Sequence, residues 1–223
     1  IGTSKTCIVV GEVKADSAVK ILGIGVTKSA GVRKGEIYDF SQARACLKDA
    51  LAKAEDASDV EIGSVFLAVT GAHIQGVNHR GTYRLPDGEP TVTAEHVEEA
   101  RTIAREVHIP PDHVYLHPII RNYWLDGLEH STTPVGLFGK TVEADFHVVH
   151  GIGTRIQNSI KLVREMPLEV DDIVFSPIAT AQMADPYRCV DQDQVSISWR
   201  RRGATFNFGW LPPSFARRLA LSR

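Results

Sequence analysis

The sequence has little cysteine and no long hydrophobic run, and each shortage excludes a class of protein. Only three of its 223 residues are cysteine, an odd number spread widely along the chain. This spacing excludes a disulfide framework and a cysteine-based metal knuckle, and it favours a reducing, cytosolic setting. No apolar run approaches the roughly 20 residues that a membrane span needs, and no signal peptide is visible. We therefore expect a soluble, intracellular polypeptide.

An excess of charge of one sign is also lacking. The chain has 25 Lys and Arg against 27 Asp and Glu, which gives a net charge of −2. This balance gives no reason to expect nucleic acid as a partner. Hydrophobic residues make up 43% of the chain, enough to bury a core and to build more than one unit.

The first third of the chain predicts the start of a layered α/β domain. Two β-branched runs, Thr6–Val13 and Val19–Val26, predict a pair of strands. Ser41 is the expected N-cap of the helix that follows. Its buried face should consist of Ala43, Cys46, Leu47, Ala50, Leu51 and Ala54. The continuous apolar run Ile62–Thr70 predicts a strand that is buried on both faces.

Between residues 76 and 168 the sequence predicts a compact two-layer unit inserted into the first domain. Residues 76–90 are rich in glycine, proline and charge, which indicates a crossing between units. The expected elements are a helix capped by Thr93, an extended segment at 113–124, a loop at 126–139, a strand at 142–149 and a helix capped by Thr154. A short strand at 172–175 follows.

The last forty residues differ in composition from the rest. Residues 184–223 hold seven arginines and three aspartates but no Lys, Glu or His. Alternating apolar residues on either side of Arg200–Gly203 predict a β-hairpin. A basic cluster with flanking aromatic residues is compatible with RNA binding, but a charged hairpin tip is the commoner explanation. We expect no nucleic-acid partner.

The nine histidines predict no metal site and no catalytic site. His147 and His150 lie three residues apart in an expected strand, so their side chains should point to opposite faces. His113 and His117 share a face but lie about 13 Å apart, too far for one ion. Asp171–Asp172 has no partner that the sequence identifies. We therefore expect a binding or scaffold role rather than acid–base catalysis.

The opening turn has two interpretations. Gly2, Thr3, Ser4 and Lys5 lead directly into the first expected strand. Such a turn can lay backbone N–H groups and hydroxyls around a phosphate. It can equally be a surface turn at the end of the chain, because short glycine motifs are weak signals.

Seven stretches, in the same order, resemble the N-terminal part of FtsA, a family of actin-like bacterial cell-division proteins. The resemblance covers residues 1–183. The stretches are IGTSK (with VGE at 10–12) at the start, VFLAVTGAHI at 65–74, LHPI at 116–119, YWLDG at 123–127, PVGLFG at 134–139, EADFHVV at 143–149 and VDDIVFSPIATA at 170–181. Each stretch alone is a weak signal, but seven in order are specific.

The resemblance implies an α/β fold. It consists of an actin-like (RNase H-like) subdomain 1A, incomplete here, which is split by a two-layer α/β insert called SHS2 or 1C. The implied limits are 1–75 for the first part of subdomain 1A, 76–168 for the insert, 169–183 for the return to subdomain 1A, and 184–223 for a divergent or frame-shifted tail.

The resemblance also implies a cofactor, ATP with Mg, in the full-length family. Gly2, Thr3, Ser4 and Lys5 are then the residues of the first phosphate hairpin. In the family they follow an aspartate and a strand that this chain lacks.

The second phosphate loop of the family should follow Met183. Here Val190–Asp191 is followed by Gln192–Val195 in place of glycines, and their side chains hinder the close approach of a phosphate to the backbone. We therefore expect weak or no ATP binding and no enzymatic activity.

The implied function is that of FtsA, which links the FtsZ ring to the membrane at the division septum, on the cytoplasmic face. This chain would be an N-terminal fragment whose 1C insert mediates self-association and contacts with late divisome proteins. The FtsZ-binding region and the amphipathic membrane helix of the family would lie beyond Arg223. Tyr123–Gly139 is the expected contact surface, because aromatic anchors on an exposed loop commonly dominate interfaces.

Two alternatives stay open. One is an ATP-binding enzyme of the actin and sugar-kinase superfamily, which needs both phosphate loops. The other is a pilus-assembly scaffold with a related insert, which the stretch at 123–139 matches less well than it matches the division family.

Overall fold

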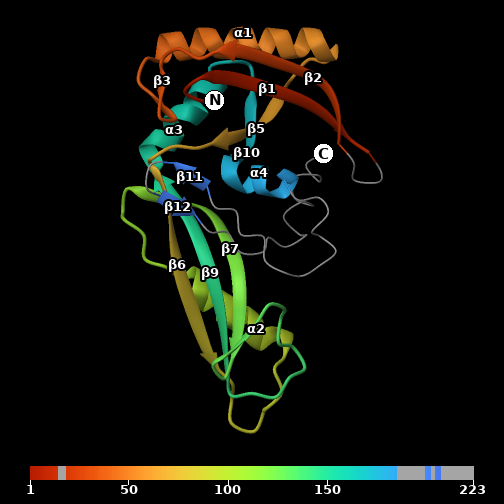
Figure 1. Cartoon of the computed structure of the whole chain (residues 1–223), viewed down its shortest axis with the longest axis vertical. Helices are drawn as coiled ribbons and strands as arrows, with labels where there is room; N and C mark the ends of the chain where they lie inside the picture. The colour runs from red at the N-terminus through yellow and green to blue at the C-terminus, as the bar shows by residue number, and fades with distance from the viewer. Residues whose placement is uncertain (15–18, 185–198, 202–203, 207–223) are drawn as a thin grey trace.

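The computed structural model describes residues 1–14, 19–184, 199–201 and 204–206 (Figure 1). The molecule is elongated, with α1 and two long strands at one end and a separate sheet with α2 towards the other. Among the described residues, no helix combines the length and apolar character needed to cross a membrane.

The first layer pairs two strands with one helix. Strands β1 (Lys5–Val13) and β2 (Val19–Lys28) are antiparallel, which confirms the predicted pair. Helix α1 (Phe40–Ser58) packs on one face of this pair. The contact is close at Gly25, where a Cβ atom would overlap the carbonyl oxygen of Ala50. Only glycine lets the two backbones approach in this way.

The predicted cap of α1 is wrong. Asp39, with an extended backbone at φ −129°, accepts a hydrogen bond from the Gln42 amide at 3.0 Å and is the N-cap. Ser41 lies inside the first turn instead. The predicted buried face is confirmed for Ala43, Leu47, Ala50, Leu51 and Ala54, while Cys46 is only half-buried.

A second, parallel pair consists of β5 (Ser64–Val69) and β10 (Glu169–Phe175). The prediction that this apolar run is buried on both faces is wrong, because its side chains alternate. Leu67 and Val69 are buried, whereas Phe66 is exposed. This two-stranded piece is therefore covered on one face only. A short hairpin of β3 (Val32–Arg33) and β4 (Glu36–Ile37) precedes α1.

Residues 74–152 form a four-stranded antiparallel sheet in the order β6-β9-β7-β8 with α2 (Ala94–Arg105) on one face. The strands are β6 (Ile74–Arg84), β7 (His113–Leu125), β8 (Leu128–His130) and β9 (Thr141–Ile152). We call this unit the insert. We call the described residues 1–73 and 153–184 the frame.

Three details of the insert region differ from the prediction. The glycine-rich stretch from residue 76, expected to be a crossing between units, is part of strand β6 as far as Arg84. Part of the expected loop at 126–139 is strand β8, which pairs with the end of β7. Helix α3 (Gly153–Arg164) is not capped by Thr154; its N-cap is Ile152, with no side-chain hydrogen bond. The Gly153 amide donates instead to the Asp112 carbonyl at 2.8 Å, because β9 runs directly into the helix. Thr93 does cap α2, as predicted.

Two apolar clusters form the core. The cluster of the insert contains α2 residues such as Val97 and Ala100 together with strand residues such as Phe146. The cluster of the frame joins α1, β5, β10 and α3, and it also takes in three strand residues of the insert: Ile74, Ile119 and Val149. Helix α3 thus packs with the frame. The predicted limits of the insert, at residues 76 and 168, stay predictions.

Helix α4 (Ser176–Ala184) follows β10. Strands β11 (Trp199–Arg201) and β12 (Ala204–Phe206) are antiparallel, which confirms the predicted hairpin over these residues. The rest of the tail lies outside the described residues, including Val190–Asp191 and the Gln192–Val195 stretch in which we expect the second phosphate loop to be altered.

Candidate phosphate-binding turn

The four predicted site residues lie together in one turn at the start of β1. The Gly2 amide donates to the Lys5 carbonyl at 3.1 Å, and Thr3, Ser4 and Lys5 are exposed. The amide N–H groups of Thr3 and Ser4 donate no hydrogen bond to any described residue. Backbone N–H groups of exposed residues beside two hydroxyls are a suitable environment for a phosphate oxygen. Phosphate binding by this turn stays a prediction.

Residue Ser29, just beyond the end of β2, holds this turn from one side. Its amide donates to the Ser4 carbonyl at 3.1 Å, and its hydroxyl lies 2.9 Å from the hydroxyl of buried Thr6. Because Lys5 is paired with Lys28 in the β1–β2 ladder, the turn and the end of β2 lie side by side. The conformation of the turn therefore depends on the position of Ser29.

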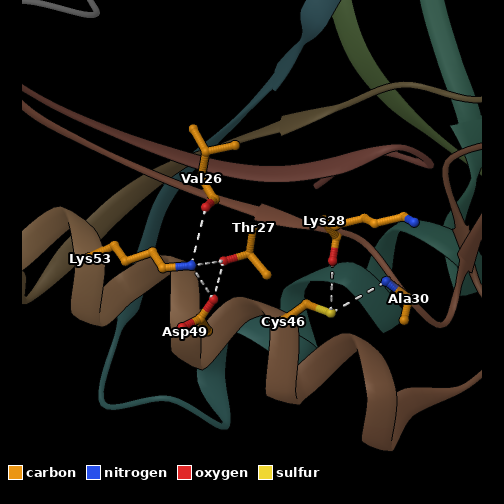
Figure 2. Close-up of polar contacts among 7 residues, drawn as sticks. All are labelled: Val26, Thr27, Lys28, Ala30, Cys46, Asp49 and Lys53. Carbon is orange, nitrogen blue, oxygen red and sulfur yellow. Dashed lines mark hydrogen bonds and ion pairs between the residues drawn. The ribbon is translucent and has the colours of Figure 1, made fainter.

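The two neighbours of Ser29 are fixed in turn by α1, as Figure 2 shows. The Cys46 thiol donates to the Lys28 carbonyl at 3.4 Å and accepts from the Ala30 amide at 3.3 Å. One side chain thus bonds to the residues before and after Ser29. In this arrangement Cys46 has a structural role, since both of its contacts are with backbone groups.

One turn further along α1, a polar cluster joins the helix to β2. The Thr27 hydroxyl donates to Asp49 Oδ2 at 2.5 Å, and Lys53 Nζ lies 2.6 Å from the same oxygen (Figure 2). The hydrogen bond from Lys53, with a further one from Thr27, lowers the pKa of the Asp49 carboxyl. Lys53 also reaches the Val26 carbonyl at 3.5 Å. These contacts fix the register of α1 against β2 and, with it, the position of Cys46.

The β3–β4 hairpin holds the turn from the other side. Its two central residues, Lys34 and Gly35, have φ of 53° and 81°, the left-handed values of a tight two-residue hairpin turn. The Gly35 amide donates to Thr3 Oγ1 at 3.3 Å. A Cβ atom on Gly35 would overlap the Thr70 carbonyl, so the hairpin tip is wedged between Thr3 and the end of β5.

The histidines form contacts that the sequence did not predict. His113 Nδ1 and His150 Nδ1 lie 2.6 Å apart across β7 and β9, and His147 Nδ1 lies 2.6 Å from Asn78 Oδ1. Burial, followed by the nearby His113, lowers the pKa of His150. No group of three or more His, Cys, Asp or Glu side chains suited to a metal is found in the part of the chain that the structure describes.

The sequence indicated a turn at residues 2–5 but not the residues that hold it in place. Ser29 and Gly35 lie 25 and 32 positions from their partners Ser4 and Thr3, and Cys46 appeared only as part of a buried helical face. A hairpin signal was present, because Lys34–Gly35 lies between two β-branched residues, Val32 and Ile37.

Residues 71–150 match the family described as the SHS2 domain inserted in FtsA. Over 181 residues the chain is 35% identical to the cell division protein FtsA of Escherichia coli K12, which covers 81% of this chain and 43% of that protein. FtsA of Neisseria meningitidis is 31% identical over 182 residues, covering 82% and 44%. FtsA of Pseudomonas aeruginosa is 35% identical over 197 residues, covering 88% and 46%.

A solved structure, the PilM-PilN type IV pilus biogenesis complex, is similar with a TM-score of 0.54 and 13% identity, covering 82% of this chain and 47% of that one. At this identity the likeness concerns the fold alone. The fold is that of an actin-like protein with an inserted domain of the SHS2 type. Within that class the chain is similar to FtsA over most of its length, which confirms the predicted resemblance. It spans a little under half the length of the curated relatives it matches.

Proposed function

We propose that the chain acts in bacterial cell division as a protein of the FtsA type, by binding other proteins rather than by catalysis. The observation that carries this proposal is the SHS2 insert of the FtsA type at residues 71–150, in a chain 35% identical to a named division protein over 181 residues. A link between the FtsZ ring and the membrane at the septum belongs to this proposal as the role of the whole protein.

The proposed contact surface is the tip of the insert. Four apolar side chains are exposed there, which we call the tip patch: Leu128, Val135, Leu137 and Phe138. Phe138 is 76% exposed and Leu128 70%. Large apolar side chains that gather in solvent are typical of surfaces that bind a partner. We propose that a second copy of the chain, or another division protein, binds here.

Two aromatic residues first assigned to this surface have other partners. Tyr123 is buried and its hydroxyl accepts from Arg101 Nε at 2.7 Å. Trp124 is half-buried, and the Arg80 guanidinium lies 4.3 Å from the centre of its ring. These contacts favour a core role for Tyr123 and a supporting role for Trp124, and they leave Phe138 as the exposed aromatic anchor.

For the nucleotide, we propose that Gly2, Thr3, Ser4 and Lys5 contact a phosphate of Mg-ATP, but weakly. Support for contact comes from Thr3 and Ser4, two exposed residues whose amide groups have no backbone hydrogen-bond partner among the described residues. Support for weakness comes from the sequence after Val190–Asp191, which lacks the glycines that a second phosphate loop needs.

The proposal is tested by producing the fluorescently tagged chain in dividing Escherichia coli, whose own FtsA is the 35% identical relative. We expect the chain to concentrate at the septum, to co-purify with FtsA, and to lengthen the cells by competing for shared contacts. The double variant Leu128→Ser/Phe138→Ser should lose all three effects.

The matched control is Tyr38→Ser, which removes an equally exposed aromatic side chain from the frame and should change nothing. A chain that is folded and abundant in the cells, yet is spread evenly and does not co-purify with FtsA, would contradict the proposed function. If the double variant behaves like the unchanged chain, the tip patch is not the contact surface.

A further inference from the structure

A polar cluster of one buried and two partly exposed side chains joins the β3–β4 hairpin to the start of the insert. Glu36 on β4 accepts from Arg155 NH1 of α3 at 2.5 Å, and its other oxygen lies 3.8 Å from His73 Nδ1. His73 stands immediately before β6 and is 3% exposed. Its Nδ1 atom has no hydrogen-bond partner in the structure. The Glu36 carboxylate thus lies between a guanidinium and a buried imidazole that has nothing else to pair with at that atom.

Glu36 directly follows Gly35, the residue whose amide donates to Thr3. The backbone of Glu36 and the Gly35 amide can move little relative to each other, because the hairpin turn consists of only two residues, both with left-handed φ. Gly71 packs closely against both the hairpin and His73. A Cβ atom at Gly71 would overlap the Lys34 carbonyl and the His73 ring. A shift of the β4 backbone at Glu36 therefore moves the amide that holds Thr3.

We propose that Glu36 is a positioning residue, which holds the Gly35 amide on Thr3 and couples the phosphate turn to the first strand of the insert through His73. The coupling rests on the proposed phosphate role of the turn. A rotation of the insert that moves His73, the residue directly before β6, changes the geometry of the turn. By reciprocity, a phosphate bound at the turn favours one orientation of the insert.

An ordinary surface ion pair is the simpler explanation of Arg155 and Glu36, and such pairs contribute little to stability. The insert offers a matched pair for comparison, Arg80 and Glu143, with N···O at 3.2 Å and similar exposure of both side chains. Among the described residues no histidine forms an ion pair with Glu143, and both partners lie on β6 and β9, outside the hairpin and the turn. Glu143→Gln is therefore the control for Glu36→Gln.

The experiment uses the whole chain labelled with ¹⁵N. In Glu36→Gln we expect the Gly35 amide to exchange with solvent about tenfold faster, since the charge that holds the hairpin is lost. The Glu36 carboxylate raises the pKa of His73 against the lowering by burial, so its removal should lower the pKa of that imidazole further. Glu143→Gln should leave both readouts unchanged.

Titration with Mg-ATP separates this inference from the proposed function. If the amides of residues 2–5 do not shift in the unchanged chain, the phosphate role of the turn fails, while the exchange of Gly35 still reports on Glu36. The coupling is supported by two results together. In the unchanged chain, Mg-ATP should shift the amide signals of residues 2–5 and of His73. In Glu36→Gln, Mg-ATP should bind at least fivefold more weakly. If Glu36→Gln changes neither the Gly35 exchange nor the titration, Glu36 is not a positioning residue, whatever the affinity.

Discussion

The insert and the frame bury their apolar residues in different ways. The insert has one continuous four-stranded sheet, and α2 covers its apolar face. The frame has three separate two-stranded pieces, β1–β2, β3–β4 and β5–β10. On the β1–β2 pair, aliphatic side chains between 45% and 61% exposed remain in solvent: Val9, Val13, Val19, Ile21, Ile24 and Val26. Both regions leave apolar side chains in solvent, the insert at its tip patch and the frame along β1–β2, but only the insert closes its buried cluster with its own residues.

Dependence between the two regions is therefore one-sided. The frame cluster includes Ile74, Ile119 and Val149 from the strands of the insert. The buried residues of the insert cluster, in contrast, all lie within residues 74–152. Loss of the insert should weaken the frame more than loss of the frame weakens the insert.

The largest expected effect comes from two glycines that allow a helix to touch a strand. In the frame Gly25 faces Ala50 of α1, and in the insert Gly81 faces Ala104 of α2; an added Cβ atom would overlap backbone in both places. Each change to alanine should cost about 3 kcal/mol or more of unfolding free energy, because the helix must move off its sheet. Thermal and urea unfolding measure the cost.

These two variants also test the one-sided dependence. Gly25→Ala should melt the frame and leave the insert folded, whereas Gly81→Ala should weaken both. Gly63→Ala is the control, since a Cβ atom there has open space. Equal loss of both regions in both variants would contradict the comparison.

A second prediction concerns the insert in isolation. Residues 71–153, produced alone, should unfold cooperatively, because the buried cluster of α2 and the four strands lies within them. A longer segment that ends at Leu168 also contains α3, whose buried side chains Ile156 and Leu162 belong to the frame cluster. This extension should therefore raise the unfolding free energy of the isolated insert by less than about 1 kcal/mol. A broad, non-cooperative melt of both segments would contradict an autonomous insert.

A third prediction concerns acid. Burial lowers the pKa of His73, His117 and His150, so the folded chain binds fewer protons than the unfolded chain near pH 6. Stability is fully present above the ordinary histidine pKa of about 6.5 and is lost as the pH falls below it. The melting temperature should therefore drop between about pH 7 and pH 5.

His117 offers the sharpest variant for this test. Its Nε2 atom accepts from the Phe175 amide at 3.0 Å, which requires a neutral ring. His117→Gln, which offers an amide oxygen that does not titrate, should flatten part of the pH dependence. The control is His108→Gln at an exposed position, and a profile unchanged in both variants would contradict the assignment.

The smallest expected effect is nucleotide binding. Calorimetry with Mg-ATP should give a dissociation constant weaker than about 100 µM, corresponding to a binding free energy of less than about 5.5 kcal/mol, because the sequence after Val190–Asp191 lacks the glycines that a second phosphate loop needs. Thr3→Val should weaken it further. A micromolar constant would show that the Gln192–Val195 stretch has been misinterpreted.

The sequence alone predicted the elements with strong local patterns. Strands β1 and β2 and the buried face of α1 follow from β-branched runs and helical spacing. The cap of α1 was misplaced because Asp39 and Ser41 are both good capping residues, and the choice depends on which backbone is extended. Strand β8 was missed because its three residues are held by register with β7 rather than by their own pattern.

The contacts around the turn at residues 2–5 could not be predicted for a related reason. The bond from Gly35 to Thr3 depends on how a hairpin docks, and the contact of His113 with His150 depends on the register of β7 and β9. Both join residues that are far apart in the sequence, so no local pattern encodes them.

Native-state hydrogen exchange, followed amide by amide in the whole chain, tests the difference between the insert and the frame most directly. We predict that amides of β7, β9 and α2 exchange only through the highest-energy opening, while those of β1, β2 and α1 exchange through an earlier one about 2 kcal/mol or more lower in free energy. Equal protection in both regions, or stronger protection in β1 and β2 than in β9, would contradict a self-closed insert beside a dependent frame.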